Sequence, residues 1–131
     1  MDAQTFKEWQ DPEINAVNRA PMHTNFFAYE STEAATEAVK EKSANFMTLN
    51  GIWKFRWVKD SDARPTDFWK IGYNDKGWDD LPIPAMWELN GYDVPLYSGV
   101  GFDWKLWKGW CKNNPPVVPV ENNHVGSYRR L

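Results

Sequence analysis

The sequence predicts an all-β domain, a β-sandwich with an extended N-terminal arm and one short helix. Three observations support this prediction. Apolar and charged residues alternate from Phe46 to Val58, prolines and glycines recur through the second half of the chain, and only residues 31–42 have the composition of a helix. A length of 131 residues suits one domain with a modest core. We expect the arm and the helix over residues 1–45 and the sandwich over residues 46–131.

The stretch from Phe46 to Val58 is the strongest candidate for a strand. Lys54 and Arg56 have one parity in it, and five large apolar side chains have the other. These five are Met47, Leu49, Trp53, Phe55 and Trp57. A period of two is typical of a sheet with one buried face, so we expect the apolar parity to form the core. Asn50-Gly51 predicts a turn or a bulge just before the strand.

The N-terminal part combines an arm with a helix. Residues 1–29 show no regular period and contain prolines and asparagines, which predicts an extended arm. Its aromatic residues indicate that the arm is held in place, either by the chain's own sheet or by another domain or subunit. Residues 31–42 (STEAATEAVKEK) predict a short surface helix, capped by Ser31 or Thr32 and with lysines near its C-terminal end.

Turn signals and aromatic residues are densest from Leu81 to Phe102. Three prolines, at positions 82, 84 and 95, exclude a helix or a central strand there, and Asn90-Gly91 is a turn dipeptide whose glycine can adopt a positive φ. The large rings are Trp87, Tyr92 and Tyr97. They fit two interpretations, the packed edge of a sandwich or an aromatic rim that stacks on the C–H faces of a carbohydrate.

Composition excludes several classes of function. The net charge of −3 gives no reason to expect a nucleic acid or an anionic membrane as a partner. Cys111 is the single cysteine, so no internal disulfide can form. The chain has no long apolar run and no apolar stretch after Met1, which predicts a soluble, cytoplasmic protein, or a periplasmic or secreted one if a signal peptide was trimmed.

No arrangement of residues typical of a catalytic site is found in the sequence. Asp79 and Asp80 are adjacent, and in a strand their side chains would point to opposite faces. His23 and His124 have no metal-ligand spacing, and we expect both to be structural. A Ser-His-Asp pattern, a glycine-rich phosphate loop and a Cys-His cluster are all missing.

Four runs spread over nearly the whole chain hold aromatic residues, prolines and glycines at particular spacings. They are Trp9-Gln10-Asp11-Pro12 leading to Asn18-Arg19, SANFMTLNGIWKF from Ser43 to Phe55, Ile83-Pro84-x-x-Trp87-Glu88-x-x-Gly91-Tyr92-x-x-Pro95-x-Tyr97, and PPVVPVENNHVGSY from Pro115 to Tyr128. In this order they resemble the N-terminal domain of the large β-galactosidases of glycoside hydrolase family 2. The family's corresponding runs include S-L-N-G-x-W-x-F, V-P-x-N-W-(Q/E)-x-x-G-Y-x-x-P-x-Y and P-P-x-V-P-x-E-N-P-x-G-x-Y.

The resemblance implies a more specific fold. Residues 75–84 follow the D-x-x-W-x-x-(I/L)-x-(V/I)-P pattern that is common in jelly-roll domains attached to this family. Residues 46–131 would then be the N-terminal part of a jelly-roll-like sandwich of the galactose-binding type, truncated before its later strands. A truncated sheet would expose an edge that favours association with another chain.

The resemblance also implies substrate-binding residues. Gly99 stands where the family usually has an asparagine that reaches into the galactose pocket, and Val100 matches the apolar neighbour that lines it. Tyr97 and Asp93 border the same place, and Trp104 belongs to a tryptophan-rich segment, DWKLWKGWCK, that we expect beside the substrate cleft. The direct polar contact of the family is missing at Gly99 or comes from elsewhere.

A metal site and an oligomer follow from the same resemblance. Glu8, Asp11 and the backbone carbonyl of Ile14 match positions where the family can hold a divalent cation, with help from residues further along. Oxygen ligands of this kind suit Mg²⁺, which keeps several waters. The family's arm runs along neighbouring parts of a large oligomer, so we expect a homo-oligomeric parent enzyme.

The leading hypothesis is the N-terminal portion of a β-galactosidase, which removes terminal non-reducing β-D-galactose from β-galactosides such as lactose. The family's two catalytic glutamates lie on a later barrel domain that needs about 250 residues, so this chain is expected to be inactive alone and to require the rest of the parent enzyme. A different hypothesis is an independent carbohydrate-binding module that stacks sugars on Trp87, Tyr92, Tyr97 and the Trp104 cluster. A third is a purely structural interaction domain.

Overall fold

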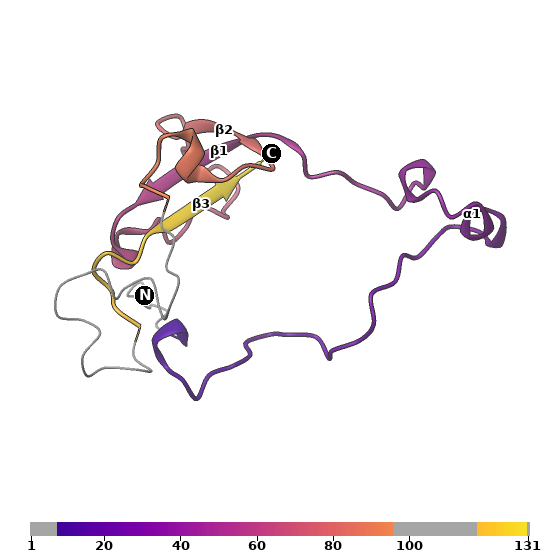
Figure 1. Ribbon diagram of the computed structural model, residues 1–131, viewed down its shortest axis with the longest axis horizontal. Coiled ribbons are helices and arrows are strands. Elements are labelled where there is room, and N and C mark those ends of the chain that lie inside the picture. Colours follow the sequence, from indigo (N-terminus) through magenta and orange to yellow (C-terminus); the bar gives the residue numbers. More distant parts are fainter. Residues whose placement is uncertain (1–7, 96–117, 131) are drawn as a thin grey trace. The chain divides into compact units, whose positions relative to one another are not determined.

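A computed structural model describes residues 8–95 and 118–130 of the chain (Figure 1). The chain separates into two compact units. One consists of residues 16–50, and the other includes residues 8–15, 51–95 and 118–130. The larger unit holds all three described strands and short 3₁₀ turns at Glu8–Gln10, Ser61–Ala63 and Trp87–Asn90. The smaller unit holds helix α1 and a 3₁₀ turn at Lys40–Lys42.

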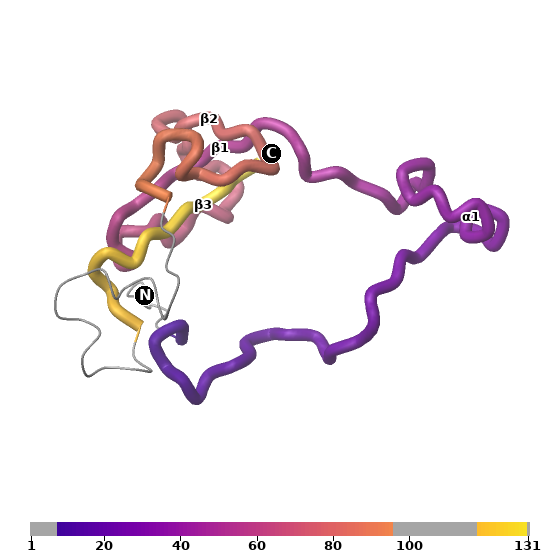
Figure 2. Tube along the Cα trace, in the orientation of Figure 1, coloured from indigo at the N-terminus to yellow at the C-terminus, as the bar shows by residue number. Residues whose placement is uncertain are grey.

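The larger unit is built on a three-stranded antiparallel sheet. Its strands are β1 (Gly51–Val58), β2 (Asp79–Ile83) and β3 (Val125–Arg129), in the spatial order β2-β1-β3. The tube in Figure 2 shows β3, from the end of the chain, lying beside β1. With strands and loops and very little helix, the described residues confirm the predicted all-β class.

The two faces of this sheet follow from its register, because successive side chains of a strand point to opposite sides. Phe55 lies opposite Tyr128 of β3 and Asp79 of β2, and these residues mark what we call the ring face. Lys54 lies opposite Arg129 and Asp80, and these mark what we call the clamp face. Phe55 and Leu81 are fully buried, at 0% and 1% exposure, so the core is centred on the ring side of β1 and β2.

The predicted strand is confirmed over its second half and wrong over its first. β1 begins at Gly51, which has a φ of 137° and lies opposite the last residue of β2, Ile83. Met47 and Leu49 lie before this point and are 80% and 57% exposed. Their alternation continues beyond the end of the sheet, so the prediction that they belong to the core fails.

The proline and turn predictions hold in β2 and after it. Pro82 lies in an edge strand, where a residue that lacks an N–H is tolerated. Gly91 ends the turn at Trp87–Asn90 with a φ of 89°, a conformation that glycine adopts without strain. Just before β2, the residues from Asp75 to Gly77 form a turn that the amide of Trp78 closes by donating to the carbonyl of Asp75 at 2.9 Å.

Helix α1 of the smaller unit spans Thr32–Glu37 and is shorter than predicted. Ser31 caps it as expected, since its hydroxyl accepts the amide of Ala34 at 3.2 Å. Ala38 then takes a left-handed conformation and closes the helix onto the carbonyl of Ala34. The helix buries none of its residues, so nothing outside it favours its extension through the β-branched Val39 to residue 42.

A carboxylate holds the smaller unit together. Glu30 accepts the hydroxyl of Ser43 at 2.5 Å and the amide of Ala44 at 3.2 Å, and the hydrogen bond from Ser43 is the main cause that lowers the pKa of Glu30. Asn45 donates to the carbonyl of Ala28 at 2.8 Å. The two ends of the α1 region are thus joined to each other. None of the helices in the described part of the chain has the length and apolar character needed to cross a membrane.

Candidate functional site

The aromatic residues that predicted either packing or a sugar rim form a cluster on the ring face. The ring of Phe55 lies 4.7 Å from that of Tyr92, 4.8 Å from that of Tyr128 and 6.1 Å from that of Trp87. Trp87 fits there because position 126 of β3 is a glycine. A Cβ at Gly126 would lie 2.6 Å from Cε3 of Trp87 and 2.8 Å from Cε2 of Phe55. Trp87 and Tyr92 therefore pack on the sheet and do not form a free rim.

Two tyrosine hydroxyls of this cluster stay protonated over a wide pH range. Burial is the main cause that raises the pKa of Tyr92. The hydrogen bond that its hydroxyl donates to the Asp79 carboxylate, at 2.8 Å, raises this pKa further. Burial is also the main cause that raises the pKa of Tyr128, and the charge of Glu88 adds to it. Both hydroxyls are therefore neutral at neutral pH.

Asp93 and His124 are in close contact beside the cluster. The Asp93 carboxylate contacts Nδ1 of His124, and the two side chains are only 14% and 12% exposed. The ring of Trp57 meets the imidazole edge-on at 5.2 Å. Asp93 has a φ of 65°, and the amide of Val94 donates to its other carboxylate oxygen at 2.8 Å. The carboxylate predicted to bind substrate is thus engaged within the chain through both of its oxygens.

The remaining predicted substrate-binding residues, Tyr97, Gly99, Val100 and Trp104, lie outside the described residues. Their roles stay predictions.

The predicted metal ligands lie at the start of the described chain. The amide of Asp11 donates to the carbonyl of Glu8, and the amide of Ile14 donates to the carbonyl of Asp11, both at 3.1 Å. A carboxylate oxygen of Asp11 accepts the amide of Glu13 at 3.0 Å. Within residues 8–95 and 118–130, no three acidic, histidine or cysteine side chains are arranged to hold a metal ion. The Mg²⁺ site therefore stays a prediction that depends on further ligands.

Asp79 and Asp80 were expected on opposite faces, and their partners confirm it. Asp79 accepts from Tyr92 on the ring face, whereas Asp80 forms an ion pair with Lys54 at 2.7 Å on the clamp face. Carboxyl groups on opposite faces of one strand cannot act together on a single bond.

Arg129 is the residue that sequence reasoning missed. It is 7% exposed, and its guanidinium donates to the carbonyl of Phe68 at 2.9 Å and that of Lys70 at 3.3 Å, and pairs with the Asp75 carboxylate. The guanidinium also lies 5.9 Å from the ring centre of Tyr73. One arginine thereby fixes the loop between β1 and β2 to the end of β3. These partners lie more than fifty positions away in the sequence, so no pattern of neighbouring residues predicts the contacts of Arg129.

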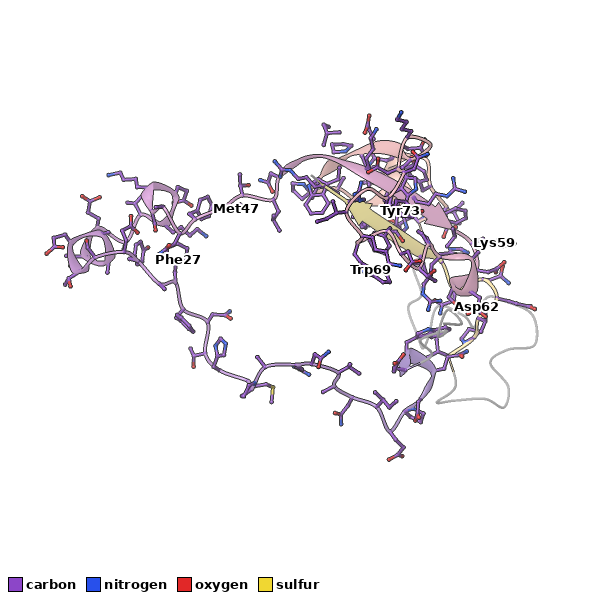
Figure 3. All side chains as sticks on the ribbon, turned by 180° about the vertical axis from the view of Figure 1, so that it is seen from behind. Phe27, Met47, Lys59, Asp62, Trp69 and Tyr73 are labelled. Carbon is purple, nitrogen blue, oxygen red and sulfur yellow. The ribbon has the colours of Figure 1, made fainter. Side chains whose placement is uncertain are left out.

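An open groove lies between β3 and the loop that joins β1 to β2. It has a volume of about 430 Å³ and its walls are residues 64–66, 68, 69 and 125–128. Figure 3 labels Trp69 and Tyr73 of the loop between β1 and β2, next to β3. Trp69 is 62% exposed although Phe68 supports it edge-on at 5.8 Å. The groove therefore presents an aromatic wall beside an edge strand.

Comparison with known proteins gives one consistent result. The chain is 32% identical over 132 residues to a β-galactosidase of Priestia megaterium and 37% identical over 120 residues to one of Halalkalibacterium halodurans. It is 28% identical over 123 residues to a β-galactosidase of Photobacterium profundum. No protein-family model matches the chain. The alignments cover 91–98% of this chain but only 11–12% of each relative, so nearly all of the chain is similar to a small segment of β-galactosidases.

Proposed function

We propose that this chain is the N-terminal portion of a family 2 β-galactosidase, and that it completes the structure of the enzyme without carrying out catalysis itself. The observation that carries the proposal is the similarity of 91–98% of the chain to a segment of β-galactosidases. The proposal assigns one wall of the galactoside pocket to Gly99 and Val100. Hydrolysis then belongs to the parent enzyme, and this chain supplies support and part of the binding surface.

The chemistry of glycoside hydrolysis supports a non-catalytic role. A retaining glycosidase needs two carboxyl groups about 5–5.5 Å apart, one as the acid/base and one as the nucleophile. The most suggestive pair in the sequence, Asp79 and Asp80, is divided between the two faces of the sheet. Asp93 is already bound to His124. These three carboxylates thus serve structural contacts, which agrees with catalytic groups on a later domain.

The packing of the ring face argues against an independent sugar-binding module. That hypothesis places Trp87 and Tyr92 in a stacking platform together with Tyr97 and the Trp104 cluster, and the rings of Trp87 and Tyr92 pack against Phe55. In addition, the indole N–H of Trp87 is buried and reaches no acceptor within the described ranges. A platform for sugars would present its ring faces and its polar groups to solvent.

The experiment that tests the proposal is hydrolysis of a chromogenic β-galactoside by the 131-residue chain alone and in a mixture. The second component is the Priestia megaterium β-galactosidase without the segment that matches this chain. We expect no hydrolysis by either component alone and hydrolysis by the mixture, because only the mixture holds both the support and the catalytic domain.

Two controls make the outcome decisive. A heat-denatured sample of the chain tests whether folded protein is needed, and a galactose-competitive inhibitor tests whether the activity arises at a galactoside site. Hydrolysis by the chain alone would contradict the non-catalytic role. Absence of hydrolysis in the mixture, with both components folded, would contradict the assignment to a β-galactosidase.

A further inference from the structure

The tripeptide Leu-Asn-Gly occurs twice in the described part of the chain, in two different surroundings. One copy, residues 49–51, leads into β1, and the other, residues 89–91, ends the turn at Trp87–Asn90. Both asparagines and both glycines are exposed. An asparagine before a glycine is prone to deamidation, because a glycine has no Cβ to hinder the attack of its amide nitrogen on the asparagine side chain. With the same tripeptide and similar exposure, the surrounding structure decides which copy reacts.

The second copy is held in a geometry that opposes this reaction. Nδ2 of Asn90, which would be the leaving group, donates to the carbonyl of Met86 at 2.8 Å. The amide of Gly91, which would be the nucleophile, donates to the carbonyl of Trp87. Attack requires the nitrogen and the side-chain carbon to approach each other in the right orientation. Both hydrogen bonds must therefore break before Asn90 can react.

The first copy lies at the end of a strand pair. The structure has neither a helix nor a turn at Asn50, and Gly51 is the first residue of β1. Gly51 pairs with Ile83, which is the last residue of β2, so this pair ends the ladder between the two strands. The end of a ladder opens at a lower free-energy cost than its middle. The amide nitrogen of Gly51 can thus reach the Asn50 side chain after a small local opening.

A positive charge also lies beside the first copy. A Cβ on Gly51 would lie 3.7 Å from Nη2 of Arg130 and 3.8 Å from its Cζ, so the guanidinium is close to the backbone of Gly51. At Gly91, nothing lies within 4 Å of the corresponding position. During the attack, negative charge develops on the glycine nitrogen and then on the oxygen bound to Cγ of the asparagine. A nearby guanidinium stabilises such a charge and thereby lowers the barrier.

We propose that Asn50 is a site of spontaneous deamidation, that Arg130 promotes the reaction, and that Asn90 is protected from it. The nitrogen of Gly51 loses its proton to water and bonds to Cγ of Asn50, the Cγ–Nδ2 bond breaks, and Nδ2 leaves as ammonia. Water then opens the succinimide ring at one of its two carbonyls, which gives aspartate or isoaspartate. The reaction needs only this chain and water, so it does not depend on the proposed function.

The product alters the start of β1. A neutral amide becomes a carboxylate, and in isoaspartate the main chain runs through one additional carbon just before Gly51. That extra carbon displaces Gly51 from its position opposite Ile83, the last pair of this ladder. Deamidation would therefore loosen β1 from its first residue onward.

The first test follows both copies in one aged sample of the wild-type chain at mildly alkaline pH. Trypsin separates them, because cleavage after Lys42 and Lys54 isolates Asn50, and cleavage after Lys76 and Lys105 isolates Asn90. Mass spectrometry measures the conversion of amide to carboxyl, and an isoaspartyl methyltransferase detects isoaspartate. We expect Asn50 to convert at least about tenfold faster than Asn90, because two hydrogen bonds protect Asn90.

The same measurement in concentrated urea is the control for the flanking residues. Unfolding removes both the hydrogen bonds of the second copy and the guanidinium beside the first. The two rates should then lie within about threefold of each other.

The second test removes the charge beside Gly51. Arg130→Gln should slow the conversion of Asn50 by about fivefold and leave that of Asn90 unchanged. Arg130→Lys keeps the charge and should restore most of the rate. Arg56→Gln is the matched control, since Arg56 is an exposed arginine of β1. Near-UV circular dichroism shows that each variant keeps the wild-type fold.

The outcomes decide each part of the proposal. Faster conversion of Asn50 that disappears in urea, with slowing by Arg130→Gln alone, would support it. Equal rates in the folded chain, or a difference that persists in urea, would overturn the structural protection of Asn90. Conversion of Asn50 without isoaspartate would overturn the succinimide route. Equal effects of Arg130→Gln and Arg56→Gln would overturn the role of Arg130.

Discussion

The ring face and the clamp face of one small sheet are stabilised by different interactions. On the ring face, Phe55 is surrounded by three aromatic rings, and one of them, Tyr92, donates a hydrogen bond to the carboxylate of Asp79 at the edge. On the clamp face, the guanidinium of Arg129 binds two backbone carbonyls and a carboxylate. The ring face depends on shape and volume, and the clamp face depends on satisfied polar groups.

The difference shows how a loop without regular structure can be held against a sheet by one side chain. The loop between β1 and β2 has no strand of its own over Phe68 to Trp78, so its carbonyls need donors from elsewhere. Arg129 supplies them from β3 and adds a contact with the ring of Tyr73. An aromatic side chain at position 129 would fill the same space but would leave those carbonyls and Asp75 without the guanidinium.

The largest effect is expected from removal of that guanidinium. Arg129→Leu should lower the free energy of unfolding by about 3–5 kcal/mol, because it leaves a largely buried carboxylate and two carbonyls without their donor. Arg129→Lys should fall between Leu and wild type, since a lysine keeps the charge but cannot reach all three acceptors at once. Urea denaturation followed by tryptophan fluorescence measures both.

Arg56→Leu is the matched control, because Arg56 lies on the same face of β1 and is exposed. It should change the free energy of unfolding by less than about 1 kcal/mol. Equal losses from Arg129→Leu and Arg56→Leu would show that the clamp face does not depend on the buried guanidinium.

A smaller effect is expected from one added methyl group on the ring face. Gly126→Ala should lower the free energy of unfolding by about 1–3 kcal/mol, because its Cβ would overlap the rings of Trp87 and Phe55. Gly77→Ala is the control, since nothing lies within 4 Å of a Cβ there and its φ is not in the left-handed region. Thermal unfolding of both variants compares them, and an equal shift in Tm would contradict the tight contact at position 126.

The smallest expected effect is a loss of stability at alkaline pH that comes from the two tyrosines of the ring face, Tyr92 and Tyr128. Below about pH 10 the hydroxyls of Tyr92 and Tyr128 are protonated in the folded and the unfolded chain, and they add no pH dependence. Above that pH the unfolded chain ionises first because the folded pKa of both tyrosines is raised, so the free energy of unfolding falls until the pH passes the folded pKa.

The measurement is urea denaturation between pH 8 and about pH 11, with wild type and the double variant Tyr92→Phe/Tyr128→Phe at constant salt. The double variant should lose less stability across this range than wild type. A steeper or an unchanged decline in the double variant would mean that other groups set the alkaline limit.

The parts of the fold that could be predicted are those fixed by neighbouring residues. The alternation around Phe55 predicted a strand, the proline at 82 predicted an edge, and Asn90-Gly91 predicted a turn, because each effect acts within a few residues. A helix cap at Ser31 or Thr32 was predicted for the same reason, and the structure shows Ser31 in that role. The end of α1 was not predicted, because helical composition alone does not show that a helix lacks a surface to pack on.

The parts that could not be predicted depend on contacts between distant positions. Alternation could not show that Met47 and Leu49 extend beyond the sheet, since the length of β1 depends on β2. Two interpretations remained for Trp87, and the missing Cβ of Gly126, almost forty positions away, decides between them. The partners of Arg129 and of Asp93 likewise come from distant segments. The candidate site was therefore predictable in its residue types and not in its pairings.

The contact between Asp93 and His124 has a consequence for how the described segments stay together. Asp93 follows the turn at Trp87–Asn90, and His124 directly precedes β3, about thirty positions further along the chain. Their side chains are only 14% and 12% exposed, so the contact ties this turn to the start of β3 in a place largely shielded from water. A break of the chain between these two residues should therefore leave both of its sides attached to the sheet.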